Sequence, residues 1–203
     1  MQKKEPLIVI GCGGHAISVI DIAESTDRWE IIGLIGQRNE VGKKIMNYEV
    51  IGTDDDLKNI RSKTKNILLG IGQIKNPKKR IEIIEKLKNL EFNTPTIISK
   101  NAYVSKNATI KEGCSVGHFS VINSGAKVGS FCILNSKCLV EHNSKIGDLC
   151  HISTGVIING DVSIGNKSFL GSGCIIREGL SIPDNIVIGA GKRIMGWPPN
   201  SPK

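Results

Sequence analysis

"ISTGVIINGDVSIGNKSFL", residues 152–170, places an aliphatic side chain at every sixth position: Ile152, Ile158, Ile164 and Leu170. A period of six fits neither the 3.6-residue period of a helix nor the two-residue period of a strand. The same phase holds for seventeen consecutive positions: Ile98, Val104, Ile110, Val116, Ile122, Val128, Leu134, Val140, Ile146, Ile152, Ile158, Ile164, Leu170, Ile176, Ile182, Ile188 and Ile194. An unbroken hexad predicts a parallel β-helix, in which each hexad forms one short strand and a turn.

The positions next to each aliphatic residue support this interpretation. Two residues before it stands a small residue in most hexads: Ala102, Ala108, Cys114, Ser120, Ala126, Cys132, Cys138, Ser144, Cys150, Ser168 and Cys174. The residue just after it is often glycine or asparagine, as at Gly117, Asn123, Gly129, Asn135, Gly147, Asn159, Gly165, Gly171 and Gly189. We expect these two types to supply the positive φ of tight corners. Three hexads close a triangular coil of 18 residues, so the prism is roughly 27 Å tall at about 4.8 Å per strand.

The hexad phase also explains the cysteines. Five of the six occupy the small inward position, where a free thiol behaves as a small hydrophobic group. No pair has the CxxC spacing of a zinc site. We therefore expect structural free thiols in a reducing compartment, with neither a metal nor a disulfide.

The first half has a different pattern, in which strands alternate with helices. A buried strand is expected at Leu7–Ile10, a helix from Gly14 to Ser25, and further strands within residues 29–36 and 65–72. A short helix should begin near Asp54, and residues 76–90 form an amphipathic helix whose apolar face is Ile81, Ile84, Leu87 and Leu90. This alternation predicts a small Rossmann-like α/β domain over residues 1–94, followed by the prism over 95–203.

The turn Gly11-Cys12-Gly13-Gly14-His15-Ala16 directs backbone N–H groups to a helix N-terminus, which is a natural phosphate site. It nearly fits GxGxxG/A, a weak signal by itself. A dinucleotide site would also need an acid after the second strand, where Gly36-Gln37-Arg38 stands instead, so NAD is disfavoured. A nucleotide-sugar pyrophosphate, a phosphate-free sugar acid, or a turn that serves only close packing all remain open.

Composition excludes several classes of protein. Hydrophobic residues make up 39% and charged residues 23%, an ordinary soluble balance, and the longest apolar runs are too short for a membrane span. Residues 1–6 do not resemble a signal peptide, which predicts a cytoplasmic protein. The net charge of +8 suits anionic small molecules, whereas aromatic residues at 4% leave no stacking platform for nucleic acid.

The hexads resemble those of the hexapeptide-repeat acyltransferases, whose fold is the left-handed parallel β-helix. Together with the glycine turn and the short α/β domain, the whole chain is similar to the sugar acetyltransferase group that contains NeuD-type sialic acid O-acetyltransferases and PglD-type nucleotide-amino-sugar N-acetyltransferases. The most specific matching segments are Gly11–His15, Glu141-His142 through Ile146-Gly147, and His151-Ile152-Ser153. The resemblance implies acetyl-CoA as cosubstrate, no metal, a homotrimer, and a role in the synthesis of surface glycans.

The resemblance also assigns roles to residues. His142 matches the catalytic histidine, the general base that takes a proton from the acceptor, and imidazole suits that task because it titrates near neutral pH. His151, Ser172 and Ala190 match positions that contact the cofactor. The acceptor-binding positions fall on Gly13, Gly14, His15, Gly36, Gln37 and Gly72. His118 is expected to be a solvated surface residue.

One departure concerns the residue after the base. N-acetyltransferases of this group carry an acid there, but this chain has Asn143, whose amide can orient the ring without adding charge. Glu141 could support the base only if the corner turned its side chain back toward the ring. This departure weakens the match to the N-acetyltransferase branch. However, a hydroxyl acceptor needs a strong base more than an amine does, so the choice between N- and O-acetylation stays open.

Two other classes of function compete with this interpretation. A carbonic anhydrase can be built on a hexad prism, but His142 and His151 have no clear third ligand. A non-catalytic sugar- or nucleotide-binding protein is the second rival. The C-terminal segment Met195-Gly196-Trp197-Pro198-Pro199 ends the hexads, either as a cap on the prism or as a cover for the adenine of the cofactor.

Overall fold

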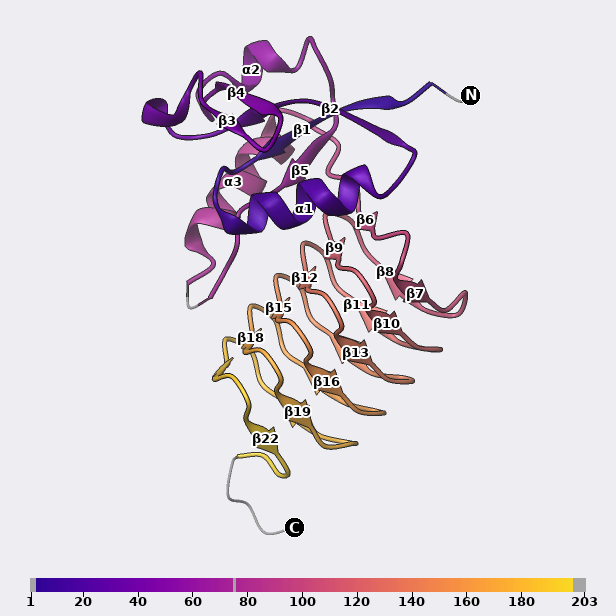
Figure 1. Cartoon of the computed structure of the whole chain (residues 1–203). Coiled ribbons are helices and arrows are strands. Elements are labelled where there is room, and N and C mark those ends of the chain that lie inside the picture. Colours follow the sequence, from indigo (N-terminus) through magenta and orange to yellow (C-terminus); the bar gives the residue numbers. More distant parts are fainter. Residues whose placement is uncertain (1–2, 75, 199–203) are drawn as a thin grey trace. The chain divides into compact units, whose positions relative to one another are not determined.

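The computed structural model describes residues 3–74 and 76–198, and the chain divides into two compact units, Met1–Ile97 and Ile98–Lys203 (Figure 1). Met1 and Gln2, which entered the expectation about a signal peptide, lie outside the described residues. Pro199 of the C-terminal segment also lies outside them.

The first unit is a five-stranded sheet with the order β3-β4-β2-β1-β5. Strands β1 (Glu5–Ile10), β2 (Trp29–Ile35), β4 (Tyr48–Gly52) and β5 (Ile67–Leu69) pair in parallel, whereas β3 (Lys44–Ile45) is antiparallel to β4. The helices are α1 (Gly14–Glu24), the 3-10 turn η1 (Arg38–Glu40), α2 (Leu57–Ile60) and α3 (Lys78–Asn89). The predicted α/β alternation is therefore observed.

Strand β1 lies in the middle of the sheet and is apolar along most of its length because helices of this unit cover both of its faces. Helix α1 contributes Ala16, Val19, Ile20 and Ala23 to the same core. Two details differ from the prediction. Helix α3 buries Ile83, Ile84 and Leu87 together with Arg80, while Ile81 and Leu90 are only half-buried. Helix α2 begins at Leu57 rather than near Asp54, because Asp56 Oδ2 accepts the backbone N–H of Thr53 and closes a turn before the helix.

The second unit consists of two-residue strands in three parallel sheets. The first sheet contains β7 (Tyr103–Val104), β10 (Val121–Ile122), β13 (Leu139–Val140), β16 (Ile157–Ile158), β19 (Ile175–Ile176) and β22 (Arg193–Ile194). The second contains β8 (Thr109–Ile110), β11 (Lys127–Val128), β14 (Lys145–Ile146), β17 (Ser163–Ile164) and β20 (Ser181–Ile182). The third contains β6 (Ile97–Ile98), β9 (Ser115–Val116), β12 (Ile133–Leu134), β15 (His151–Ile152), β18 (Phe169–Leu170) and β21 (Val187–Ile188).

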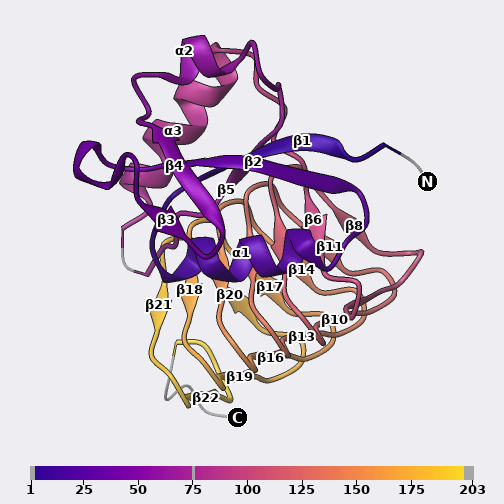
Figure 2. The same cartoon turned by 45° about the horizontal axis from the view of Figure 1, so that its top comes forward.

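Every strand pairs with the strand 18 residues further along, so each turn of the chain adds one rung to all three sheets. Figure 1 shows the first sheet as a column from β7 to β22, and the tilted view in Figure 2 displays the second from β8 to β20. The second residue of each strand is the predicted aliphatic one, and these side chains form a single core. The fold class is confirmed: an α/β unit followed by a left-handed parallel β-helix of hexapeptide repeats.

The corners correct one expectation. The residues with positive φ lie three positions after the aliphatic residue, not one: Gly113, Phe119, Gly125, Phe131, Lys137, Asn143, Leu149, Gly155, Asp161, Lys167, Gly173, Gly179, Asn185 and Gly191. The glycines directly after the aliphatic residue have ordinary φ. They are small because the next coil passes closely: a Cβ on Gly117 would lie 2.5 Å from the N atom of Ser136, and one on Gly171 would lie 2.5 Å from the N atom of Ala190. Steric exclusion, rather than conformational freedom, therefore selects glycine at these positions.

The small inward residues also do more than fill space. The thiol of Cys132 donates to the carbonyl of Gly147 at 3.0 Å, and the Ser144 hydroxyl donates to Asn159 at 2.7 Å, each time 15 residues ahead in the next coil. Burial raises the pKa of the Cys132 thiol well above its ordinary value, so it stays protonated and keeps its hydrogen to donate. Serine and cysteine are thus interchangeable here, since both are small donors. All six cysteines are free.

At the end of the prism, Trp197 packs against the apolar core of this unit, as a cap would. Among the described helices, none combines the length and the apolar character that crossing a membrane requires.

Candidate active site

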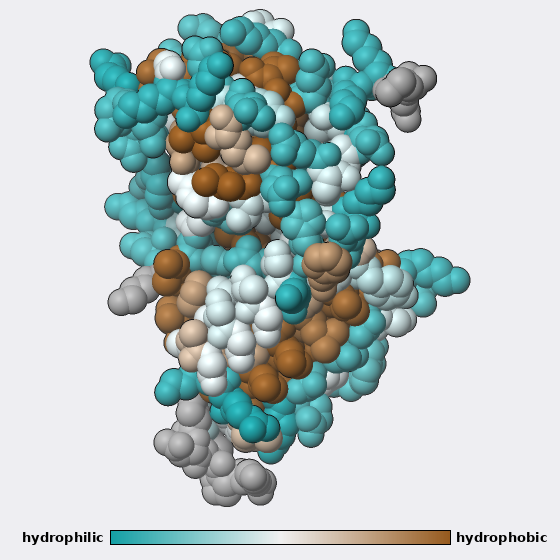
Figure 3. Space-filling model, in the orientation of Figure 1, coloured by the Kyte–Doolittle hydropathy of each residue, from teal (hydrophilic) through white to brown (hydrophobic). Residues whose placement is uncertain are grey.

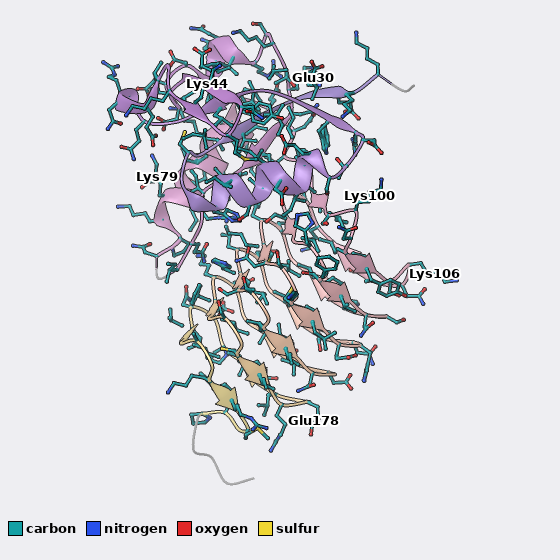
Figure 4. All side chains as sticks on the ribbon, in the orientation of Figure 1. Glu30, Lys44, Lys79, Lys100, Lys106 and Glu178 are labelled. Carbon is teal, nitrogen blue, oxygen red and sulfur yellow. The ribbon has the colours of Figure 1, made fainter. Side chains whose placement is uncertain are left out.

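His142 lies at the corner between β13 and β14, where the chain leaves the first sheet for the second. The same corner recurs every 18 residues, so Lys106 and Glu178 mark its two ends in Figure 4, both directed away from the prism. The imidazole is correspondingly exposed, with 59% of its side-chain surface accessible. The hexad phase thus predicts its outward orientation correctly.

Three groups surround the ring. The next coil passes beneath it at Gly160, where an added Cβ would lie 2.6 Å from Nε2. The amide nitrogen of Asn143 lies 3.5 Å from Nδ1. The carboxylate of Asp161 lies 4.0 Å from the same Nδ1. The ring therefore rests on bare backbone, with an amide and a carboxylate beside one nitrogen.

The backbone explains why Asn143 can occupy its position. Its φ of 60° is left-handed, a conformation that asparagine tolerates better than most residues. Glu141 is turned toward the preceding coil, where its Oε2 accepts a hydrogen bond from Asn123 Nδ2 at 2.8 Å. The same oxygen accepts the backbone N–H of His142 at 3.3 Å. Glu141 therefore holds the corner rather than the ring.

The predicted cofactor residues lie on another side of the prism. His151 is in β15 of the third sheet, its Nε2 is 3.0 Å from Asn135 Nδ2, and its ring meets Phe169 edge-on at 5.1 Å. Ser172 and Ala190 follow β18 and β21 of that same sheet and stack in adjacent coils, since the Gly191 N–H donates to the Ser172 carbonyl at 2.8 Å. One chain therefore groups these three residues with each other but does not bring them to His142.

His118 differs from the expectation of a solvated residue. It lies at the corner after the third sheet, is only partly exposed, and its Nδ1 is 2.6 Å from the Ser99 hydroxyl. It has a structural partner within the prism.

In the first unit, the predicted acceptor residues gather at one edge of the sheet. Strands β1, β2 and β5 are parallel, so the turns that follow them, at Gly11–His15, Gly36–Gln37 and Gly70–Gly72, come together at their carboxyl ends. A Cβ on Gly72 would lie 3.4 Å from the Cβ of His15, which shows how close two of these turns lie.

Within this edge, Gly13 caps helix α1 without a side-chain hydrogen bond. The space at the Cβ positions of Gly13 and Gly14 is open. Gly11 is different: its φ is 123°, and a Cβ there would lie 2.7 Å from the carbonyl oxygen of Gly70. Gly11 thus serves the close packing of two turns, while Gly13 and Gly14 leave the helix N-terminus uncovered.

The sequence did not reveal the role of Glu40. Its Oε2 accepts the backbone N–H of Gln37 at 2.7 Å and would lie 2.8 Å from a Cβ on Gly36. An acid therefore does stand beside the end of β2, delivered by the turn η1 from three residues further on. Together with burial, which acts more strongly, Glu40 raises the pKa of Cys12 to about 11. A search for an acid directly after the strand could not find it.

Arg80 is a second residue that the sequence did not single out. It is almost fully buried in α3, and its Nη1 donates to the carbonyl of Ile71 at 2.9 Å. Arg80 thereby holds the turn after β5, which carries Gly72. A buried arginine in an amphipathic helix that is otherwise lysine-rich on its exposed side is the available signal, but it is a weak one.

Among the described residues, no three histidine, cysteine, aspartate or glutamate side chains are grouped as ligands for a metal ion.

Comparison with known families gives two matches. Residues 6–87 match the PglD N-terminal domain, and residues 161–193 match the hexapeptide repeat of succinyl-transferase. No curated protein sequence matches the chain.

Solved structures match across almost the whole chain. Perosamine N-acetyltransferase from Caulobacter crescentus, a histidine-to-asparagine mutant in complex with CoA and GDP-perosamine, is 25% identical, with a TM-score of 0.88, 94% of this chain and 88% of that chain covered. The acetyltransferase domain of PglB from Neisseria gonorrhoeae, in complex with acetyl coenzyme A, is 27% identical, with a TM-score of 0.82 and coverage of 93% and 90%. WeeI from Acinetobacter baumannii, at 20% identity, a TM-score of 0.74 and coverage of 96% and 98%, shares the fold.

The fold and these matches define a hexapeptide-repeat transferase preceded by a PglD-type α/β domain. The chain is a PglD-like sugar acetyltransferase, as the resemblance in its sequence predicted.

Proposed function

We propose that the chain transfers an acetyl group from acetyl-CoA to the amino group of a nucleotide-linked amino sugar. The observation that carries the proposal is an exposed imidazole on a rigid corner, with a carboxylate within 4.0 Å of one ring nitrogen, in a fold shared with acetyltransferases that bind CoA and a GDP-sugar. A sialic-acid-type hydroxyl is the second candidate acceptor, and the presence of Asn143 after the base keeps it in view.

The chemistry needs one base and no metal. The amine attacks the thioester carbonyl, His142 takes the proton that the nitrogen loses, and the CoA thiolate leaves and is protonated. A backbone N–H of a neighbouring coil holds the oxyanion of the tetrahedral intermediate. No acyl-enzyme is required, and the prism cysteines point inward, away from the corner.

The acceptor is held by the turns of the first unit. The open N-terminus of α1 at Gly13 and Gly14 offers backbone N–H groups and the positive end of the helix dipole to a pyrophosphate. His15, Gly36, Gln37 and Gly72 line the same sheet edge. This role distinguishes the first unit as an acceptor-binding domain, covering residues 1–94, from the acyltransferase prism that follows.

We further propose a homotrimer. His142 and the cofactor residues His151, Ser172 and Ala190 lie on different sides of one prism, so a second copy is needed to bring the two sets together. The outward side chains of the first sheet form an apolar column, which Figure 3 shows as a brown stripe across the lower part of the view: Tyr103, Val121, Leu139, Ile157 and Ile175. This column borders the His142 corner and would be covered by the neighbouring prism. The setting is cytoplasmic synthesis of a surface-glycan precursor.

The decisive experiment measures thiol release from acetyl-CoA with a panel of amino sugars, sialic acids and nucleotide sugars. We expect a nucleotide-linked amino sugar to give the fastest release. His142→Ala should lower kcat at least about a hundredfold, the usual contribution of a general base, and leave acetyl-CoA binding nearly intact. His118→Ala is the matched control, since that histidine belongs to the prism but is bonded to Ser99.

Three outcomes would redirect the proposal. A fully active His142→Ala variant would refute the mechanism. Release with no acceptor on the panel, together with tight sugar binding, would favour a non-catalytic binding protein. Stoichiometric zinc in the purified protein would favour the carbonic anhydrase-like alternative.

A further inference from the structure

Asn143 leaves the base without the acid that related N-acetyltransferases carry next in sequence, but the next coil supplies one. Asp161 stands 18 residues after Asn143, so it occupies the same corner position one rung further along. Its carboxylate Oδ2 lies 4.0 Å from His142 Nδ1, within ion-pair distance. The stacking of coils therefore returns the charge that the local sequence lacks.

The backbone fixes this neighbourhood. The N–H of Asp161 donates to the carbonyl of His142 at 3.0 Å, and the N–H of Gly179 continues the ladder to the carbonyl of Gly160 at 2.9 Å. Asp161 has a left-handed φ of 55°, which aspartate accepts readily. Gly160, just before it, keeps the space beneath the ring free of side chain. The spacing of the two side chains is thus a property of the prism rather than of a mobile loop.

The two neighbours of Nδ1 have different hydrogen-bonding capacities. An amide can present either its oxygen or its NH2 group, so Asn143 accommodates a protonated or an unprotonated Nδ1. A carboxylate only accepts, so Asp161 favours a proton on Nδ1. Only that tautomer leaves the lone pair of Nε2 free to take a proton from the acceptor.

We propose that Asp161 is the positioning residue of His142: it selects the Nδ1–H tautomer and stabilises the imidazolium in the role that an acid at position 143 would otherwise fill. The inference rests on the proposed function. Both side chains are exposed, at 59% and 63%, so the contact strengthens when bound substrates displace water from the corner. Glu141, the other carboxylate at this corner, is engaged by Asn123 and by the backbone N–H of His142.

The first test reads the tautomer directly in the free, full-length protein. The ¹⁵N resonances of the His142 ring, assigned by comparison with a His142→Gln variant, should show mainly the Nδ1–H form near pH 8. In Asp161→Asn the population should shift toward Nε2–H. Asp184→Asn is the matched control, because it removes one carboxylate from another corner of the prism, where Asp184 bonds Asn166. An unchanged tautomer in Asp161→Asn would overturn the proposal, whatever reaction the protein performs.

The second test measures catalysis. Asp161→Asn should lower kcat about tenfold, as expected for losing one charge about 4 Å from the base, with KM for acetyl-CoA and acceptor within about twofold. Adding Asn143→Asp to that variant should restore most of kcat, since the carboxylate then returns from the family position. Full activity in Asp161→Asn would contradict the proposal. If the wild type has no transferase activity at all, the proposed function fails, while the tautomer measurement still decides the role of Asp161.

Discussion

Asn143 and Asp161 show how far one residue's identity depends on backbone conformation. Both lie at the left-handed position of a corner, with φ of 60° and 55°. Asparagine and aspartate tolerate that conformation, so either can stand at either rung with little strain. Whether the acid follows the histidine in sequence or lies one coil away is therefore nearly equivalent for the backbone, although the two positions reach the ring differently.

Cys12 is a residue whose chemistry the tertiary structure sets. Burial, and after it Glu40, raise its pKa to about 11, so at pH 8 the thiol is protonated and reacts slowly with an alkylating reagent. We expect its modification rate, followed by mass spectrometry, to rise steadily with pH up to about 11. Glu40→Gln should increase the rate at pH 8 severalfold, because a carboxylate that opposes the thiolate is gone.

The comparison for Cys12 needs a carboxylate that lies elsewhere on the same sheet. Glu49→Gln, in β4, provides it and should leave the rate unchanged. Equal rates in Glu40→Gln and the wild type would show that Glu40 has no influence on the thiol.

At the scale of the element, each hexad is a strand, a corner and a contact with the next coil. The strand buries an aliphatic residue, and the small residue before it donates to a carbonyl 15 positions ahead, as Cys132 does to Gly147. The corner turns on a residue of positive φ. The glycine directly after the aliphatic residue allows the next coil to approach. Three different physical demands thus fall at fixed places within six residues.

Gly171 and Gly189 test the last of these demands, because they stand at the same place in successive coils. A Cβ on Gly171 would lie 2.5 Å from the backbone N of Ala190, whereas nothing lies within 4 Å of a Cβ on Gly189, and neither has a positive φ. Gly171→Ala should therefore lower the free energy of unfolding by about 1–3 kcal/mol, measured by urea denaturation. Gly189→Ala should change it by less than about 0.5 kcal/mol. Equal effects would mean that conformational freedom, not contact with the next coil, selects glycine here.

At the scale of the whole molecule, the distribution of residues over the three faces of the prism matters most. The first sheet presents an apolar column, whereas the outward residues of the second sheet are polar: Thr109, Lys127, Lys145, Ser163 and Ser181. The third sheet carries His151 and, at its edge, Ser172. This asymmetry is what a threefold assembly requires, since each prism must meet its neighbours with unlike faces.

Leu139→Lys tests the assembly. A charge in the middle of the apolar column should shift the protein from trimer toward monomer in sedimentation experiments, because an unpaired ammonium would be buried in the interface. Acetyl transfer should fall together with the trimer, since the cofactor residues come from another copy. Ser163→Lys, on the polar second sheet, should keep both the assembly and the activity. A trimeric Leu139→Lys variant would place the interface elsewhere.

The sequence by itself determined the prism, because a six-residue period over seventeen positions has one structural solution, and it also determined that His142 points outward. The N-terminal alternation was likewise readable, apart from the rotation of α3, where Ile83 and Arg80 rather than Ile81 and Leu90 face inward.

Only the tertiary structure decided what stands beside the chemical groups. Asp161 meets His142 through the 18-residue rise of the coil, Glu40 reaches Cys12 through the turn η1, and His151 lies on a different sheet from His142. Local patterns could not show these relations, because each joins residues whose distance is set by coil stacking or by a turn. A period reveals which way a side chain points, whereas the distance between two side chains appears only once the coils are stacked.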